Sequence, residues 1–558
     1  MKELFEKTKK FILKMAEKEF VPIGLLIVVY TIISFINLGS LKNPQTFTRI
    51  KANEEIVFEL SEGNATIFRV FLGDEVGKHT ILASTDGTQY HEIGTIDTVY
   101  CFSWNDINID DIYKYFKLRC DEEGDLGEVA FLDKNLNIID VKNDLNIKEE
   151  LLDEPKAVPE VIGFMNSTYF DEVYFARSAY QYVHNIPVME WTHPPLGKLL
   201  QAIPILFLGM TPFAYRLMGN LAGIAVIAVM YLLAKEIFGN RKYALLAAFI
   251  MAFDNFHFAQ TRMGTSDGFL LLFCLTSGLF MYKYLKLNIA DDNNNKKIFK
   301  YLGLSGLFWG LATSVKWNSF YFGLGLAIVF FIKLIYDIVT DKKTIKKYIK
   351  IALICVVFFI VIPLSIYALC FFLFPNIQPN GGVWSIQDLI EQTKTMYNYH
   401  ATLDAEHPFT SPWYTWPLML KPVWYHSSNP GAGMASTISG IGNPAIWWVG
   451  ALTFIYAFRS NKKENIFITI MALVTWLPYI FIGRIMFLYH YILALPFVML
   501  GIVSFIKLIT EKLKKNWIII GYMAIVLVFF SIFYPIVSGH VISEEKVESL
   551  KWLEEWYF

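Results

Sequence analysis

Long apolar runs alternate with short polar connections along the chain. The first apolar run, residues 21–39, can cross a hydrocarbon core about 30 Å thick, because a helix rises about 1.5 Å per residue. Ten runs of comparable character follow at residues 213–234, 243–259, 265–282, 301–316, 318–335, 351–374, 441–458, 465–482, 485–506 and 517–535. The pattern predicts a polytopic α-helical membrane protein with about eleven transmembrane helices.

Basic residues follow the same rhythm as the apolar runs. Every second connection is rich in lysine or arginine, namely residues 235–242, 283–300, 342–350, 459–463 and 507–515. Basic connections stay in the cytoplasm, and the lysines within residues 2–18 place the N-terminus there too. We therefore expect a multi-pass protein of the cell (plasma) membrane, with residues 41–160, 375–440 and 536–558 on the extracytoplasmic side.

Two polar segments are long enough to form structure outside the membrane. Residues 41–160 contain alternating runs such as "IVFELSEG" and "TIFRVFLG" separated by Gly, Asp and Asn, which predict an inserted β-sandwich-like domain. Cys101 and Cys120 lie in this domain and would pair only if the fold brought them together. Residues 375–440 are rich in aromatic residues, which fits either sugar stacking or an interfacial aromatic belt.

Charged residues on the outer side point to a polar cavity. Only 18% of the 558 residues are charged, against about 25% in soluble proteins, so each isolated charge is informative. Four single cations stand at the outer ends of spans: Arg216, Arg262, Lys316 and Arg484. A cation there either snorkels to the headgroups or faces a cavity or an anion. The acidic and imidazole side chains of Asp171, Glu172, His193 and Asp267 on the same side favour a cavity.

This set of residues suits group transfer from a lipid-linked sugar phosphate. Arginine and lysine stabilise a phosphate as it leaves, and a carboxylate takes the proton of an acceptor hydroxyl. Paired cations can replace a metal, so we expect no metal and no cofactor. The predicted organisation is a first span (1–40), the β-rich domain (41–160), a catalytic membrane core (161–374), the aromatic-rich loop (375–440), C-terminal spans (441–535) and a tail (536–558).

Six motifs between residues 160 and 510 occur in the order known from one enzyme family. They are "FDEVYF" (170–175), "THPPLGK" (192–198), "AYRLMGN" (214–220), "TRMGTSDGFLL" (261–271), "ATSVKWNSFYF" (312–322) and "GRIMFLYHYILALPF" (483–497). The chain thereby resembles the protein O-mannosyltransferases, GT-C fold enzymes of glycosyltransferase family 39, and looks like a prokaryotic member. The resemblance implies a polyprenyl-phosphate-mannose donor (dolichyl in eukaryotes), a Ser/Thr hydroxyl acceptor on a secreted or membrane protein, and inversion at the anomeric carbon.

The resemblance also implies roles for individual residues. Asp171 would be the catalytic base and Glu172 would orient the acceptor. Contacts to the donor phosphate or sugar would come from Arg216, Lys316, Arg484 and His490, and secondary site residues would be His193, Lys198, Arg262 and Asp267. Simple helix starts are the alternative for Asp171, Asp267 and the Pro-Pro pair after His193. The chain departs from the family at Trp191, where an Asp is frequent, and in its 41–160 domain.

Two other functions fit parts of the pattern. A related GT-C enzyme would pass another lipid-linked sugar to a lipid or cell-wall polymer with the same cations and base. A glycolipid transporter or a sugar-binding membrane sensor belongs to a different class. Transporters commonly contain inverted repeats and interrupted spans near mid-membrane, and the sequence has no such repeat. Charges gathered on one face favour chemistry at that interface.

Overall fold

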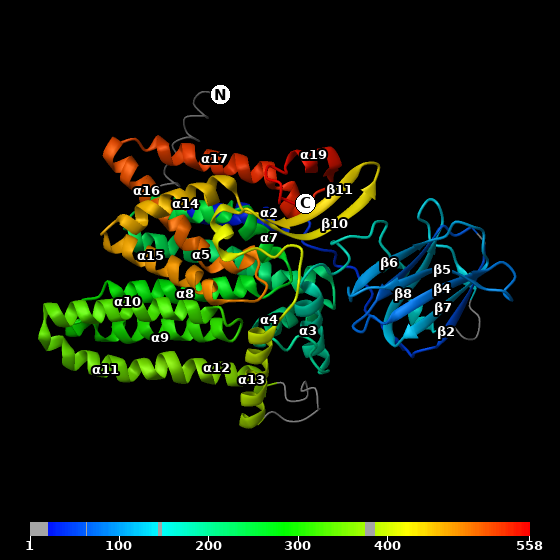
Figure 1. Ribbon diagram of the computed structural model, residues 1–558, viewed down its shortest axis with the longest axis horizontal. Helices are drawn as coiled ribbons and strands as arrows, with labels where there is room; N and C mark the ends of the chain where they lie inside the picture. The colour runs from blue at the N-terminus through cyan, green and yellow to red at the C-terminus, as the bar shows by residue number, and fades with distance from the viewer. Residues whose placement is uncertain (1–19, 63, 143–147, 374–384) are drawn as a thin grey trace.

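The bundle of long helices and the two-sheet domain of residues 48–142 occupy opposite ends of the molecule (Figure 1). The computed structural model describes residues 20–62, 64–142, 148–373 and 385–558. The long helices run side by side along the long axis: α2 (Val21–Phe35), α5 (Pro212–Phe238), α6 (Arg241–Ala252), α8 (Asp267–Leu285), α9 (Asn295–Thr313), α10 (Ser319–Thr340), α11 (Ile345–Val356), α12 (Ile362–Phe372), α14 (Pro444–Arg459), α15 (Lys463–Trp476), α16 (Leu495–Leu513) and α17 (Trp517–Phe533).

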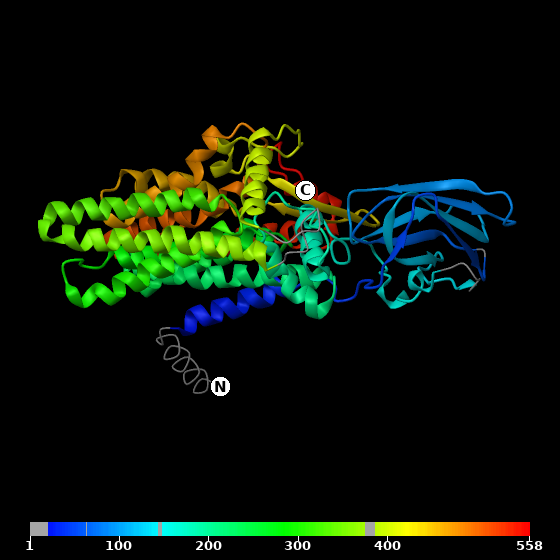
Figure 2. The same cartoon turned by 90° about the horizontal axis from the view of Figure 1, so that it is seen from below.

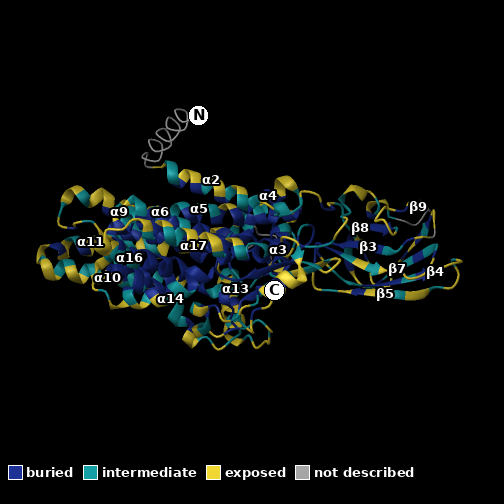
Figure 3. Ribbon diagram, turned by 90° about the horizontal axis from the view of Figure 1, so that it is seen from above, coloured by how far each residue is buried: buried dark blue, intermediate teal, exposed yellow. Residues whose placement is uncertain are grey.

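The bundle is apolar enough to lie in a membrane. Among the described residues, five helical stretches have the length and hydropathy to cross one, at Pro212–Phe238, Asp267–Leu285, Ser319–Thr340, Lys342–Phe372 and Lys463–Phe481. Shorter apolar helices are α2, α4 (Leu196–Leu208) and α17. Buried residues fill the middle of the bundle, whereas exposed residues mark the outer faces of peripheral helices such as α2 (Figure 3). Exposed leucines and phenylalanines on these faces suit contact with lipid.

Two predicted spans differ from the structure. The run at 243–259 is not one helix, because α6 ends at Ala252 and α7 (Asn255–Arg262) starts after Asp254, whose side chain caps it by accepting from the His257 amide (2.9 Å). The run at 485–506 becomes helical only at Leu495. Residues 482–494 instead form a loop and a 3₁₀ turn, which leaves polar side chains free to line a cavity.

The basic connections gather at the end of the bundle away from the β domain. Side-chain contacts join the ends of several helices there, as in Lys286–Glu236, Lys242–Asn516, Tyr243–Glu511 and Lys507–Glu464. In Figure 1 the turns from α10 to α11 and from α16 to α17 lie at this same end. The alternation of basic connections in the sequence therefore corresponds to one physical face of the bundle.

Close packing against α9 shapes the α11–α12 helix. A Cβ on Gly306 would collide with the backbone oxygen of Phe358, and one on Gly310 would stand 2.9 Å from Cα of Pro363. Small residues on one helical face allow this approach. The facing segment widens into a π-helical turn, Val357–Val361, just before Pro363, which lacks an N–H to continue the α-helical ladder.

Residues 48–142 form two antiparallel sheets. One has the order β1 (Thr48–Ile50), β8 (Gly124–Leu132), β3 (Ile67–Leu72), β6 (Ser103–Asn108), and the other β5 (His91–Asp97), β4 (Lys78–Ser84), β7 (Tyr115–Glu122), β2 (Glu55–Leu60), β9 (Val141–Lys142). Between them Phe58, Phe68 and Phe116 pack around Phe131 with ring centroids 4.8–5.6 Å apart. Cys101 and Cys120 are both free, because Cys120 lies in this core and Cys101 packs toward the bundle.

Helix α3 (Glu172–His184) connects the β domain to the bundle. Arg177 forms an ion pair with Asp74 of the β domain (2.9 Å), and Gln181 donates to the same carboxylate. Helices α3 and α13 (Ile386–Thr402) lie across the direction of the long helices (Figures 1 and 2). The hairpin of β10 (Val423–Gly431) and β11 (Met434–Gly440), extended by β12 (Ile542–Ser543), and the short helices α18 (Pro535–Ser538) and α19 (Glu544–Ser549) complete this end.

Candidate active site

A cavity of about 370 Å³ lies where the bundle meets α3 and α13. It is enclosed by the start of α3, the start of α8, the turn after α9, the end of α13 and the loop before α16. All ten charged or imidazole side chains singled out from the sequence were expected to belong to one site. The structure brings Asp171, His193, Asp267, Lys316, Arg484 and His490 to its surface.

Asp171 lines this cavity from the position just before α3. The preceding residue, Phe170, has a left-handed backbone (φ +48°) and packs on Tyr425 with ring centroids 4.7 Å apart. This turn directs the half-buried Asp171 side chain toward the cavity. Burial raises the pKa of Asp171 to about 7, and nearby Lys316 opposes the rise. A carboxyl group with a pKa near neutrality suits a general base.

Glu172 and Arg216 form a buried ion pair behind the cavity. The guanidinium donates from Nε and one terminal nitrogen to the two Glu172 oxygens, both at 2.7 Å, and neither side chain is more than 1% exposed. Its other contacts are the backbone oxygens of Leu38, Phe164 and Ser167. The predicted donor contact of Arg216 and acceptor contact of Glu172 therefore do not fit this geometry, because the pair instead fixes α3 against α5.

Arg262 and Lys198 also bond to other groups of the protein. Arg262 donates to the backbone oxygens of Ser34, Ile36 and Asn37 at the end of α2, so its charge serves a helix terminus. Lys198, 1% exposed, donates to the Glu190 carboxylate at 2.6 Å. Neither residue belongs to the cavity lining, in contrast to the predicted secondary site.

His193 is oriented by the carboxylate of Glu190, which was not among the predicted site residues. Glu190 bonds His193 Nδ1 (3.0 Å) through one oxygen and Lys198 through the other. The His193 ring lies 5.2 Å from that of His400 in the last turn of α13. The pKa of both imidazoles is lowered, mainly by burial, that of His400 to about 4. Both rings are therefore neutral hydrogen-bonding groups on the cavity surface at neutral pH.

A chain of polar contacts holds Lys316 and Asp267. Lys316 Nζ donates to one Asp267 oxygen at 2.6 Å, and Gln260 donates to the other at 2.7 Å. Tyr425 in turn donates to the Gln260 side-chain oxygen at 2.5 Å. Gln260 and Tyr425 carry no charge and lie 165 positions apart, so the sequence contained no signal for this arrangement.

Arg484 is the cation that this site leaves available. Within the described parts of the chain, no carboxylate lies within ion-pair distance of its guanidinium. Its neighbour His490 stacks on Tyr489 (4.8 Å) and Trp416 (5.9 Å). An unpaired, half-buried arginine beside a cavity suits a phosphate group. The described residues contain no cluster of three or more His, Cys, Asp or Glu side chains able to hold a metal.

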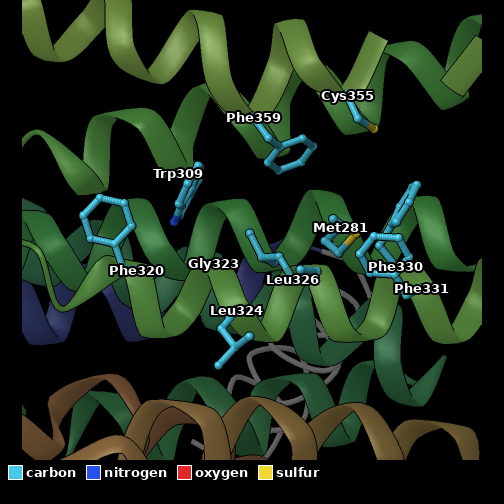
Figure 4. A pocket seen from close by; sticks show the side chains of 11 residues that line it. Met281, Trp309, Phe320, Gly323, Leu324, Leu326, Phe330, Phe331, Cys355 and Phe359 are labelled. Atoms are coloured by element: carbon cyan, nitrogen blue, oxygen red, sulfur yellow. The ribbon is translucent and has the colours of Figure 1, made fainter. Parts of the chain in front are cut away.

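Apolar space leads away from Arg484 along the bundle. A second lobe of about 230 Å³ shares His193, His400 and Arg484 with the cavity and continues past Trp317 and Phe320. These two residues also line a space of about 740 Å³ between α9, α10, α12 and α13. A further space of about 400 Å³ follows, where Trp309 and Phe359 point into the gap beside α10 (Figure 4). Together they form an apolar groove suited to a long hydrocarbon chain.

Comparison with known proteins gives consistent similarities. The family model described as dolichyl-phosphate-mannose-protein mannosyltransferase matches residues 160–374. A model of the C-terminal four-transmembrane region of protein-O-mannosyltransferase matches residues 385–463 and 458–556. Residues 40–159, with the whole β domain, lie outside both matches.

Individual relatives and one solved structure agree with these matches. The chain is 24% identical over 458 residues to polyprenol-phosphate-mannose–protein mannosyltransferase of Mycolicibacterium smegmatis, covering 69% of this chain and 87% of that protein. The protein of that name from Mycobacterium tuberculosis is 24% identical over 460 residues, covering 69% and 86%. The S. cerevisiae protein O-mannosyltransferase Pmt1–Pmt2 complex, bound to the sugar donor, has a similar fold (TM-score 0.61, 15% identity, 70% of this chain and 89% of that chain).

Proposed function

Because this chain belongs to the protein O-mannosyltransferase family and has a GT-C membrane fold, we propose that it moves mannose from polyprenyl-phosphate-mannose to Ser/Thr hydroxyls of proteins. The observation that carries the proposal is the cavity itself. It combines a carboxyl group with a pKa near 7, Asp171, with an unpaired arginine, Arg484, at the head of an apolar groove. A base, a phosphate site and a lipid site are what this transfer requires.

In the proposed reaction Asp171 accepts the proton of the acceptor hydroxyl. The hydroxyl oxygen forms a bond to the anomeric carbon of mannose as the bond from that carbon to the phosphate oxygen breaks. Polyprenyl phosphate leaves with the electron pair, and Arg484 and Lys316 stabilise its added charge. Attack opposite the leaving phosphate inverts the anomeric carbon. Since these cations supply the positive charge, we expect no requirement for a metal.

The donor lipid would occupy the apolar groove. Its phosphate would lie beside Arg484, where the two lobes of the cavity meet. The tail would then run past Phe320 and along α10 toward Phe331. Several residues on this path, including Phe320 and Phe331, are more than half exposed on the bundle surface. A carrier could therefore enter from the bilayer without crossing water.

The proposed topology places the reaction outside the cytoplasm of the cell membrane. The gathering of the basic connections at one end of the bundle supports a cytoplasmic location for that end. The cavity and the β domain would then be extracytoplasmic, and the N-terminus cytoplasmic. About eleven membrane crossings satisfy this arrangement, with α6 and α7 together forming one and α11 and α12 another.

Radiolabelled transfer tests the proposal. Membranes containing the native protein, incubated with polyprenyl-phosphate-[³H]mannose and a Ser/Thr-rich peptide, should label the peptide, with or without EDTA. Asp171→Asn should reduce the rate at least 100-fold, because the base is lost. Asp97→Asn, which changes an exposed carboxylate of the β domain, is the matched control and should leave the rate unchanged. Full transfer by Asp171→Asn would overturn the mechanism.

A related activity on another sugar remains the second candidate. The phosphate and lipid sites would serve any polyprenyl-phosphate sugar, so only the sugar contacts distinguish the two. Glucose and galactose donors offered in the same assay should give less than a tenth of the mannose rate. A preference for one of these donors would replace mannose in the proposal and leave Asp171 and Arg484 in their roles.

A further inference from the structure

The loop between β5 and β6 of the β domain is bonded directly to the segment that carries Asp171. Thr168 donates to the backbone oxygens of Cys101 (2.5 Å) and Phe102 (3.2 Å). The amide of Trp104 donates to Ser167 Oγ at 3.1 Å. This β5–β6 loop, residues 98–102, is therefore fixed three positions before Asp171. In Figure 1, β6 lies at the side of the β domain nearest α3.

The β5–β6 loop is also held in one shape. Phe102 is fully buried and has a left-handed backbone (φ +47°), which a phenylalanine keeps only where its surroundings fix it. Its ring packs on Tyr180 of α3 at 4.8 Å and on Phe47 at 5.7 Å. The ion pair of Arg177 with Asp74 secures the same junction. The loop therefore presents its outward residues at a constant place beside the cavity.

Those outward residues are apolar and exposed. Val99 is 72% exposed and Tyr100 40% exposed, and Tyr174 of α3, next to them, is 43% exposed. Tyr174 lies within electrostatic range of Asp171, Tyr399 and Tyr100. We call the set Val99, Tyr100, Tyr174, Met189 and Tyr399 the acceptor rim. No member is charged, and the last three line the Asp171 cavity.

The acceptor rim lies on the side of the cavity away from the donor groove. Tyr174, Met189 and Tyr399 line only the lobe that contains Asp171, whereas Trp317 and Phe320 line only the lobe that leads to the groove. Without lysine or arginine, the rim does not suit a lipid phosphate. Tyr174, Met189 and Tyr399 line the same cavity as Asp171, so the residues next to an acceptor hydroxyl at Asp171 lie within reach of this rim, because extended chain advances only about 3.3 Å per residue.

We propose that the β5–β6 loop makes the β domain one side of a docking site for the acceptor polypeptide. The segment that fits is extended and uncharged, with small apolar residues or proline beside the Ser or Thr, since aromatic rings and valine offer stacking surfaces without charge. The inference rests on the proposed transfer reaction. It assigns a role in acceptor choice to a domain that lies outside the family matches.

Paired acceptors test this docking site. The double variant Val99→Ser/Tyr100→Ala should raise KM about tenfold for a 15-residue Ala/Pro/Thr peptide, because it removes two exposed anchors. Val99 and Tyr100 lie outside the lining of the Asp171 cavity, so the variant's kinetics with N-acetyl-threonine amide, which has no flanking residues to contact them, and its donor KM should stay within twofold of native. Ile112→Ser is the matched control: Ile112 is 76% exposed beyond the far end of β6, about 20 Å away by strand rise, and should change none of these values.

Crosslinking separates failure of the docking site from failure of the proposed function. Benzoylphenylalanine at position 100 should crosslink the 15-residue peptide, and at position 112 it should not. An unchanged peptide KM in the double variant, or an equal loss with both acceptors, would overturn the docking site, as would absence of a crosslink at position 100. A native protein that transfers no mannose but still crosslinks the peptide would overturn the reaction and retain the docking surface.

Discussion

The raised pKa of Asp171 makes the rate of transfer depend on pH near neutrality, where an aspartate with the usual pKa stays fully ionised and gives no pH dependence. With a pKa of about 7, the carboxylate fraction is roughly 9% at pH 6 and 91% at pH 8. Since the proposed base is the carboxylate, kcat/KM should rise about tenfold between these values and level off above pH 8. A carboxyl with the usual pKa near 3.8 would give no change over this interval.

The assay should use a peptide without titratable side chains. The donor is a phosphodiester, which does not titrate near neutrality, and burial lowers the pKa of His193 from its usual value and that of His400 to about 4. Lys316 lowers the pKa of Asp171, so Lys316→Gln should move the rising part of the pH–rate profile (the limb) to higher pH. The same substitution should also slow transfer. A native profile that is flat from pH 6 to pH 8, or a limb that does not move in Lys316→Gln, would refute a base role for Asp171.

Three further substitutions test the buried ion pair, the proposed phosphate contact and the packing of the helices. Glu172→Gln should lower the free energy of unfolding by about 3–5 kcal/mol, seen in thermal melts in detergent, because it leaves the Arg216 charge buried without its carboxylate; an unchanged melt would contradict the structural role. Arg484→Gln should raise the donor KM about tenfold without changing the melt, as the arginine pairs with no carboxylate of the described chain. Gly306→Ala should cost about 1–3 kcal/mol by pushing α9 away from the π-helical turn that contains Phe358, whereas Gly501→Ala, with no atom closer than 3.8 Å, should not.

Much of the site could be predicted because charge in an apolar run is costly. Lys316 and Arg484 stood out for this reason, and Asp171 for its motif; the structure brings all three to one cavity. The same signal misplaced Arg216 and Arg262, because position along a span does not determine which way a side chain points. Their partners, a carboxylate 44 positions away and carbonyls more than 220 positions away, are set only by tertiary packing.

The helices show a similar division. Hydropathy located the long apolar helices but missed the short helix α4 and the break between α6 and α7, although Asp254 inside the run was a recognisable cap. The late start of α16 was signalled only by Pro496 in its first turn, because residues 488–493 are as apolar and aromatic as a span. Strands of the β domain occur where the sequence alternates, as in β2 and β3, but only the folded chain places the β5–β6 loop beside Asp171.

The apolar groove is open along its length to the surface of the bundle, with Phe320, Leu324 and Phe331 between half and three-fifths exposed. Every lipid or detergent molecule around the protein is therefore a competitor for the donor tail. The concentration that governs saturation is then the mole fraction of donor in the surrounding leaflet, not its molarity in the tube. Rates measured in micelles of long-chain detergent would therefore be lower than the rate in a membrane. A membrane poor in carrier lipid would itself limit how fast proteins are glycosylated.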